Sequence, residues 1–344
     1  MGVRRGYRCL LAALSCFCLF LAGCSKSGIS LGGYQISGLT SEELLCVGDE
    51  VCPLPEAMIF VSSQKKMYQD TYGAEIWQVS LGEESLEDYA LEQLKSYLGR
   101  LFAASQMAEE MRLSLTEQET VRLSQAVEDY LSHLGEQDQA VVGITRENAE
   151  DAFRRYLLAD RAYQTVLSAA DVEVSEDEAR VMEVQQIFFP REGLSEEEQT
   201  SRKSQAEQAA QAAETANDFM GLADQYDGAE ASQLSLKRSD LPSEMEQTVF
   251  SLSNGDVSGL LESEDGWRVI RCVNSYDREA TAANREQMEN QRAQDAFQAE
   301  MLAFLEDHPA AFNDSLWKRV TFSGYPGEAS ANFYDSYQAY LEEE

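Results

Sequence analysis

The stretch "NGDVSGLLESEDGWRVIRCV" (254–273) decides the fold of the central part of the chain. Asn254-Gly255 is a tight-turn signal, and a short strand follows it. A second turn at Asp265-Gly266 then leads into a final apolar strand. Two strands joined by an Asp-Gly turn predict a β-hairpin.

The hairpin ends a longer pattern of strands and helices. The segment "VMEVQQIFF" (181–189) has the β-branched and aromatic residues of a strand, and a proline ends it. Ser195 with Glu198 is a capping-box signature for a helix that runs to about residue 223. A loop and a short helix near 243–251 then lead to the hairpin. The order strand, helix, short helix, strand, strand predicts an α+β module of about a hundred residues.

Helical sequence flanks this module on both sides. "SLEDYALEQLKSYLGRLFAASQMAEEMRL" (85–113) repeats apolar residues at three- and four-residue spacing, which indicates a helix with one buried face. The same pattern and its capping residues predict helices at 116–134, 145–169 and 278–307. We therefore predict an α+β fold in which the module is inserted in, or flanked by, an all-α domain assembled from both ends of the chain.

The chain begins with a secretory pattern, "MGVRRGYRCLLAALSCFCLFLAGC" (1–24). Its apolar run is too short for a good transmembrane helix, and basic residues precede it. The run ends in "LAGC", which resembles the lipobox of bacterial lipoproteins, so the resemblance implies cleavage before Cys24 and lipid on that residue. The alternatives are ordinary cleavage nearby, with Cys24 incidental, and an uncleaved anchor. Each of them still exports the chain.

The net charge restricts the partners. The formal charge is -34, and loss of the three arginines of the signal takes it to -37. Such a chain repels phosphate backbones, which argues against nucleic acid as a partner. The acidity is typical of a solvated, aggregation-resistant surface, and attraction of basic unfolded proteins is the second interpretation.

Histidine and cysteine are scarce outside the signal. His133 and His308 are the two histidines of the chain, and no cluster has metal-ligand spacing, so the sequence predicts neither a metal site nor a cofactor. In the exported chain, Cys46 and Cys52 either form a disulfide across "CVGDEVC" or remain as two free, half-buried thiols. Cys272 lies on the final strand and is interpreted as a core residue.

Two stretches then identify a family. "DFMGLADQYD" (218–227) and "LPSEMEQTVFSLSNGDVSGLLESEDGWRVIRCV" (241–273) resemble the parvulin peptidyl-prolyl isomerases, over about residues 180 to 275. The family pattern includes a Met-x-x-x-Phe helix, "F-x-L-x-x-G-x-V-S" and a "G-x-H-I-I" strand. The positions that fall in step without a gap are Phe250, Leu252, Gly255, Val257, Ser258, Gly266 and Ile270.

The resemblance implies a site for prolyl isomerisation. Rotation about an X-Pro bond destroys amide resonance, and a catalyst must bind the twisted amide better than either planar form. A parvulin does this with an apolar socket beside a polar network, usually two histidines with a Cys or Asp and a Ser or Thr. By the resemblance, the catalytic positions here are Gln186, Asp227, Asp265 and Arg268, and the substrate-binding socket is Leu241 and Met245. Gln186 and Arg268 occupy the histidine positions, and Asp265 occupies the Ser or Thr position.

The layout of the whole chain also resembles the PrsA and SurA group of extracytoplasmic foldases. The domains expected are a lipoprotein signal peptide at 1–23, a flexible tether at 24–44, a helical chaperone-like domain at 45–175, a parvulin-like domain at 176–276, a C-terminal helical segment packing on the N-terminal domain at 277–325, and an acidic tail at 326–344. The tail, "NFYDSYQAYLEEE", is either a docking helix or a frayed terminus.

These patterns lead to one role with two mechanisms. The resemblance implies a folding factor on the outer face of a bacterial cell membrane, held there by lipid, whose partners are unfolded or newly exported proteins. It acts either as a peptidyl-prolyl isomerase, whose activity can be weak, or as a chaperone without catalysis. Arg268 with Asp265 forms either a rebuilt polar site or a surface salt bridge on a retired one. A lipoprotein that binds an envelope component on the same scaffold is the third hypothesis.

Overall fold

The computed structural model describes residues 39–342 in two compact units. Unit 1 is Met1–Ala170 with Gln294–Glu344, and unit 2 is Asp171–Ala293. The predicted signal peptide, Cys24 and most of the predicted tether lie outside the described residues. Among the residues that are described, no helix is long and apolar enough to cross a membrane.

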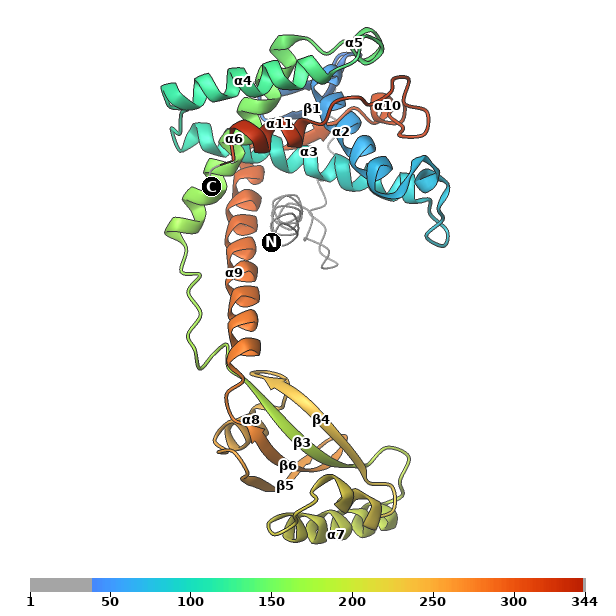
Figure 1. Ribbon diagram of the computed structural model, residues 1–344, viewed down its shortest axis with the longest axis vertical. Coiled ribbons are helices and arrows are strands. Elements are labelled where there is room, and N and C mark those ends of the chain that lie inside the picture. The colour runs from blue at the N-terminus through green and yellow to red at the C-terminus, as the bar shows by residue number, and fades with distance from the viewer. Residues whose placement is uncertain (1–38, 343–344) are drawn as a thin grey trace, which may run out of the picture. The chain divides into compact units, whose positions relative to one another are not determined.

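Unit 2 is built on a four-stranded antiparallel sheet (Figure 1). Its strands lie in the order β4-β3-β6-β5. The elements are β3 (Val181–Pro190), α7 (Glu196–Ala213), the 3-10 helix η2 (Met220–Gln225), β4 (Glu230–Lys237), α8 (Ser243–Phe250), β5 (Val257–Ser263) and β6 (Gly266–Asn274). The predicted hairpin at 254–273 is confirmed as β5 and β6.

Two differences from the sequence prediction concern the region between α7 and α8. The helix ends at Ala213 rather than near 223, and η2 follows it. The segment predicted as a loop contains β4, an edge strand, "EASQLSLK", in which Leu234 and Leu236 face the core. An edge strand with one solvated face needs few apolar residues, so its pattern is weak in the sequence.

Each face of this sheet is covered by one helix. Alternate side chains of a strand point to opposite faces, so β3 contributes Ile187 and Phe189 to one cluster and Met182 and Val184 to the other. The first cluster packs against four alanines of α7, and the second packs against Met245, Val249 and Phe250 of α8. We call the second side of the sheet the α8 face.

Gly266 fixes the turn of the hairpin. Its φ of +154° is a backbone conformation that side chains with a Cβ rarely adopt. A Cβ at this position would meet the carbonyl oxygen of Phe189 at 2.2 Å and the ring of Phe188 at 2.8 Å. The glycine of the predicted Asp-Gly turn is therefore required by space as well as by backbone conformation.

Unit 1 is mainly helical. Its helices are α2 (Leu54–Tyr72), the 3-10 helix η1 (Ala74–Gln78), α3 (Leu86–Glu110), α4 (Glu117–His133), α5 (Glu136–Val142), α6 (Arg146–Ala169), α10 (Asp314–Trp317) and α11 (Phe333–Tyr340). The long helix α9 (Arg278–Asp307) contains the boundary between the two units. The capping box of Thr116 with Glu119 opens α4, as the sequence predicts.

Unit 1 also contains a small sheet that the sequence analysis did not predict. β1 (Glu43–Val47) pairs with β2 (Glu50–Pro53) on one side and with β7 (Ala310–Phe312) on the other. Cys46 lies opposite Val51, whereas Cys52 lies opposite Leu45, so the two cysteines point to opposite faces of the hairpin. Both thiols are free and buried, which rules out the Cys46–Cys52 disulfide as an interpretation of this spacing.

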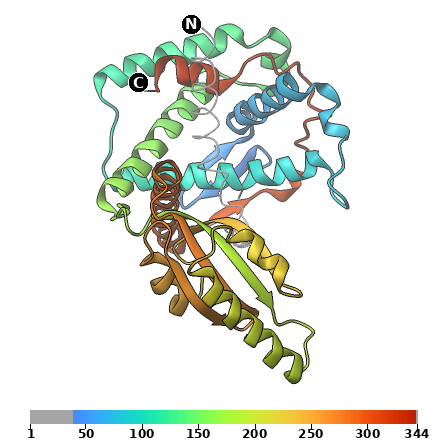
Figure 2. The same cartoon turned by 60° about the horizontal axis from the view of Figure 1, so that its bottom comes forward.

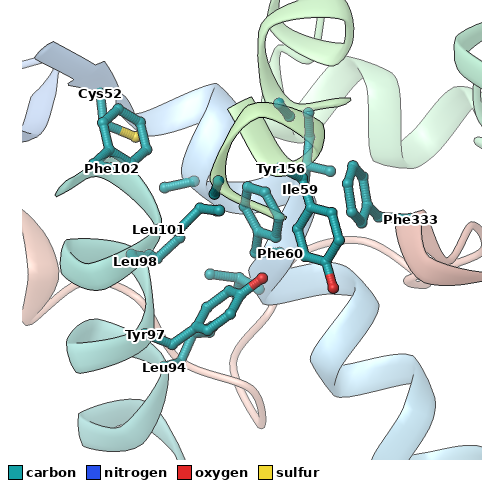
Figure 3. Close-up of a cluster of buried hydrophobic side chains, with 14 of the residues drawn as sticks. Cys52, Ile59, Phe60, Leu94, Tyr97, Leu98, Leu101, Phe102, Tyr156 and Phe333 are labelled. Atoms are coloured by element: carbon teal, nitrogen blue, oxygen red, sulfur yellow. The ribbon is translucent and has the colours of Figure 1, made fainter. Parts of the chain in front are cut away.

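The C-terminal segment is part of the core of unit 1, so the alternative of a frayed terminus is wrong. α11, drawn in dark red, lies beside α4 in Figure 1 and in Figure 2. Its Phe333 is fully buried, with ring centroids 4.2 Å from Phe153 and 5.0 Å from Phe60. Figure 3 shows Phe333 and Phe60 in one cluster with Tyr97 of α3 and Tyr156 of α6.

Buried polar groups hold the same C-terminal segment. Asp138 of α5 is fully buried, and its carboxylate accepts backbone N–H bonds from Glu328, Ala329 and Ser330 at 2.8 to 3.1 Å. The hydroxyl of Ser330 donates a further bond to it at 2.6 Å. A Cβ on Gly327 would lie 1.9 Å from the same carboxylate, so only glycine allows the chain to turn around it.

Candidate functional site

The α8 face of unit 2 changes from apolar to polar along the strands. In an antiparallel sheet, residues that are directly opposite share a face. We call a set of such opposite residues across neighbouring strands a row. The rows at the α8 end of the strands, such as Met182 with Leu236, are buried beneath α8. Two rows beyond them carry polar side chains. They are Ser232, Gln186 and Ile270, followed by Glu230, Phe188, Arg268 and Leu261.

Arg268 is held in place by its neighbours in the hairpin. Its Nη1 donates to Asp265 Oδ1 at 2.9 Å and to Ser263 Oγ, and its Nη2 donates to Asp265 Oδ2. The guanidinium carbon lies 4.4 Å from the centroid of the Phe188 ring. A planar guanidinium that makes a bidentate pair and stacks on a ring has little freedom to turn towards another group.

The pair also fixes the charge at this position. The hydrogen bonds from Arg268 and Ser263 hold the pKa of Asp265 well below its ordinary value, so the carboxylate is ionised at neutral pH. The Arg268 side chain is 14% exposed and that of Asp265 is 60% exposed. The arginine therefore contributes a largely compensated charge to the face, with its carboxylate partner on the solvent side.

The two residues predicted as the apolar socket differ in accessibility. Met245 lies on α8, is 3% exposed and packs in the cluster beneath this helix. Leu241 precedes α8 and is half-buried against the same cluster. The structure thus places both side chains on the α8 face, with Leu241 the more accessible.

The remaining predicted residues lie at different depths. Gln186 is half-buried in the middle of β3, between Ser232 of β4 and Ile270 of β6. Asp227 is exposed in the turn before β4, and its backbone carbonyl accepts a hydrogen bond from Arg202 of α7. The turn of Asp227 is therefore tied to the helix that covers the opposite face of the sheet.

Three residues on this face were missed by the sequence analysis. Phe188 and Glu230 are opposite each other in β3 and β4, and Ser263 bonds Arg268. Alternation from Gln186 places Phe188 on the same face of β3, which is a signal present in the sequence. Placing Glu230 on this face required the register of β4, and the sequence pattern did not predict that strand.

This arrangement suits binding without covalent chemistry. Gln186 and Ser232 offer neutral hydrogen-bonding groups, and Phe188 and Leu241 offer apolar surface. An X-Pro peptide rotates without any bond being broken, so orientation and polarity are the properties that matter. Among the described residues of this face, no histidine is present, because His133 and His308 both lie in unit 1.

The comparisons with known proteins agree with this geometry for unit 2. Residues 187–274 match the rotamase family, described as a PPIC-type PPIase domain. This range runs from the second half of β3 to the end of β6 and includes the whole of β4, β5 and β6. No curated protein matches the sequence.

Solved structures of three proteins also match the chain at low identity. PrsA from Bacillus cereus, a peptidyl-prolyl isomerase, is 16% identical, with 77% of this chain and 98% of that chain covered and a TM-score of 0.32. The foldase PrsA from Lactococcus lactis is 13% identical, with 80% and 98% covered and a TM-score of 0.30. A SurA-like chaperone from Campylobacter jejuni is 10% identical, with 78% and 98% covered and a TM-score of 0.27.

The family match covers most of the sheet of unit 2, except residues 181–186 of β3. The match includes the hairpin at 254–273, the whole of α8 and the end of β3 from residue 187, and it begins one residue after Gln186. It therefore rests on the elements that build the α8 face. Residues 187–274 thus match the PPIC-type rotamase domain, which is the parvulin type.

Proposed function

We propose that this protein is an extracytoplasmic protein-folding factor whose parvulin-type domain binds proline-containing segments of unfolded proteins and isomerises them weakly or not at all. The observation that carries the proposal is the rotamase domain at 187–274, with Arg268 held by Asp265 on its α8 face. The partners are unfolded or newly exported proteins.

The side chains of the site support low turnover. At the two positions that the family resemblance assigns to histidines, the sequence has Gln186 and Arg268. A glutamine amide can replace the hydrogen bonds of a neutral imidazole, whereas arginine keeps its positive charge at every physiological pH. A fixed cation bonded to Asp265 offers little that strengthens as the amide twists, and catalysis needs interactions that strengthen in the transition state.

A peptide assay tests this part of the proposal. Acceleration of X-Pro isomerisation is measured with a protease-coupled peptide and by refolding of a proline-limited protein, on the wild-type chain and on Arg268→Ala. We expect little or no acceleration by the wild type and no further loss in the variant, with binding of the peptide retained by both. Strong acceleration that Arg268→Ala abolishes would instead make Arg268 part of a rebuilt active site.

The sequence supports export and a lipid anchor as the location. The motif "LAGC" places Cys24 where bacterial lipoproteins are cleaved and lipidated. Wild type and Cys24→Ser are compared by fractionation and by mass spectrometry of the N-terminal peptide. Lipid on Cys24 and a membrane fraction that Cys24→Ser loses are expected, and an equal distribution of both proteins would contradict the anchor.

A chaperone without catalysis is the second candidate, favoured by the locked Arg268 and by the size of unit 1. In that case suppression of aggregation resides in unit 1, and a chain from which 180–275 is deleted retains it. Loss of the suppression in the deleted chain, with unit 1 still folded by circular dichroism, would assign client binding to the rotamase domain.

A further inference from the structure

Glu230 lies in the same row of the α8 face as Phe188 and Arg268. The register places it directly opposite Phe188, and Phe188 is directly opposite Arg268. All three side chains therefore share one face, with about 5 Å between the Cβ atoms of each pair. Glu230 is exposed, and within the described part of the chain its side chain makes no hydrogen bond or ion pair.

The cation in this row and a second cation beside α8 are already paired with carboxylates. Arg268 bonds Asp265, as described above. Arg238, at the edge of α8, makes a bidentate pair with Asp177 at 2.8 Å and bonds Glu246 at 3.2 Å. The uncompensated charge in the row is therefore the carboxylate of Glu230.

Lys237 and Arg191 lie away from Glu230, at the far end of β4 and on the other side of the sheet. Lys237 ends β4 and is opposite Val181, at the far end of the strands from the pair of Glu230 with Phe188. Seven residues of strand separate the two ends, which is about 23 Å. Arg191 lies on the other side of the sheet, with its guanidinium carbon 4.4 Å from the Trp267 ring and with Glu262 as its partner.

We propose that Glu230 is a specificity-determining residue, which makes the site prefer a segment with lysine or arginine next to the proline. The inference rests on the proposed function, because it names the class of segment that the same site takes. The methylene stem of a basic side chain packs on apolar surface such as Phe188 while its head pairs with the carboxylate. A glutamate at that position of the segment is repelled.

Binding of two labelled peptides to the full chain tests the proposal. The peptides differ only in the residue before the proline, which is arginine in one and glutamate in the other. Their dissociation constants are measured by fluorescence anisotropy, with wild type, Glu230→Gln and Glu230→Lys. We expect the arginine peptide to bind the wild type more tightly, by about threefold or more, since exposed ion pairs contribute effects of that size. Glu230→Gln removes the preference and Glu230→Lys reverses it.

A matched control separates a local contact from the general acidity of the chain. Glu207 is an exposed acid on α7, on the opposite face of the sheet, so Glu207→Gln makes the same change of charge away from the row. We expect Glu207→Gln to keep the preference. An equal loss in Glu207→Gln and Glu230→Gln would overturn the assignment to Glu230.

The outcomes also separate this inference from the function on which it rests. Equal and measurable binding of both peptides by the wild type overturns the role of Glu230 and leaves the folding factor standing. Absence of binding for both peptides, at any salt concentration, overturns the proposed binding function and the inference together. A preference that weakens as salt rises, and that Glu230→Gln lacks, supports both.

Discussion

In unit 1 a buried and fully bonded charge joins segments far apart in the sequence, whereas in unit 2 the ion pair on the α8 face joins near neighbours. Asp138 holds the backbone around Ser330, 192 residues away. Asp265 and Arg268 are three residues apart in one hairpin. Buried charges that are fully bonded in this way fix a unique arrangement, but they are costly to disturb. A pair whose carboxylate is exposed to solvent contributes little to stability.

The comparison predicts that variants of the C-terminal segment destabilise unit 1 far more than variants of the surface pair destabilise unit 2. Unfolding of unit 1 can be followed by the fluorescence of Trp77 and Trp317 in a Trp267→Phe background, because Trp267 is the tryptophan of unit 2. Two units need not unfold in one transition, so each variant is compared with wild type through the same probe.

The largest effect is expected for Phe333→Ala. The side chain is fully buried among Phe60, Phe153 and Tyr156 and leaves a cavity when truncated. We expect the free energy of unfolding of unit 1 to fall by about 3–5 kcal/mol in urea denaturation. The matched control is Val121→Ala, at a side chain that is 59% exposed, for which a change within about 0.5 kcal/mol is expected. A similarly small effect for Phe333→Ala would mean that the C-terminal helix does not support the core.

The next effect is expected for Asp138→Asn. Burial alone would raise the pKa of Asp138, but the hydrogen bonds from Ser330, Ala329 and Glu328 outweigh it and hold the pKa below its ordinary value. An amide at this position faces N–H donors with an NH₂ group or loses half of the acceptor sites, which costs about 2–4 kcal/mol. Glu136→Gln, an exposed acid on the same helix, is the control. If the two variants unfold alike, the carboxylate does not anchor the segment at 328–330.

A smaller effect is expected from pH, through Glu56. Burial raises the pKa of this carboxyl to about 7, although Arg155 Nε lies 3.0 Å away and lowers it. Because the folded-state pKa is above the unfolded value, the protonated folded state is favoured. Its contribution is present below about pH 4.5 and is lost as pH rises through about 7.

The measurement is urea unfolding of wild type and Glu56→Gln between pH 5 and 8. We expect the stability of the wild type, relative to the variant, to fall by about 1–3 kcal/mol over this range. A relative stability that is constant or rises with pH would show that the pairing with Arg155 outweighs burial. The variant itself supplies the baseline for all other titrating groups, including Asp138.

The smallest effect is expected for Asp265→Asn. Arg268 and Ser263 hold the pKa of Asp265 below its ordinary value, so its contribution is present at neutral pH and is lost as pH falls. Since the carboxylate is 60% exposed, we expect a loss of less than about 1 kcal/mol from unit 2, measured by Trp267 fluorescence. A loss comparable to that of Asp138→Asn would remove the contrast between the two units.

The local elements of the chain were predictable because their signals lie within a few residues. The hairpin at 254–273 follows from its Asp-Gly turn, and α7 begins at the predicted capping box of Ser195 and Glu198. The pairing of Arg268 with Asp265 was one of the alternatives open from the sequence, because the two residues flank the same turn. The weak pattern of β4 hid the position of Glu230, since an edge strand is apolar on one side only.

The sequence by itself determined the helices predicted at 85–113, 116–134, 145–169 and 278–307, the hairpin and the resemblance of residues 180 to 275, because each depends on spacing along the chain. Only the tertiary structure decided that β7 pairs with β1, that Phe333 completes the core of unit 1, and that Cys46 and Cys52 point apart. The first two contacts join residues that are far apart in the chain. The third depends on the register of β1 against β2, which decides the face to which each cysteine points. Their pairing depends on which buried surfaces fit together, and no local pattern carries that information.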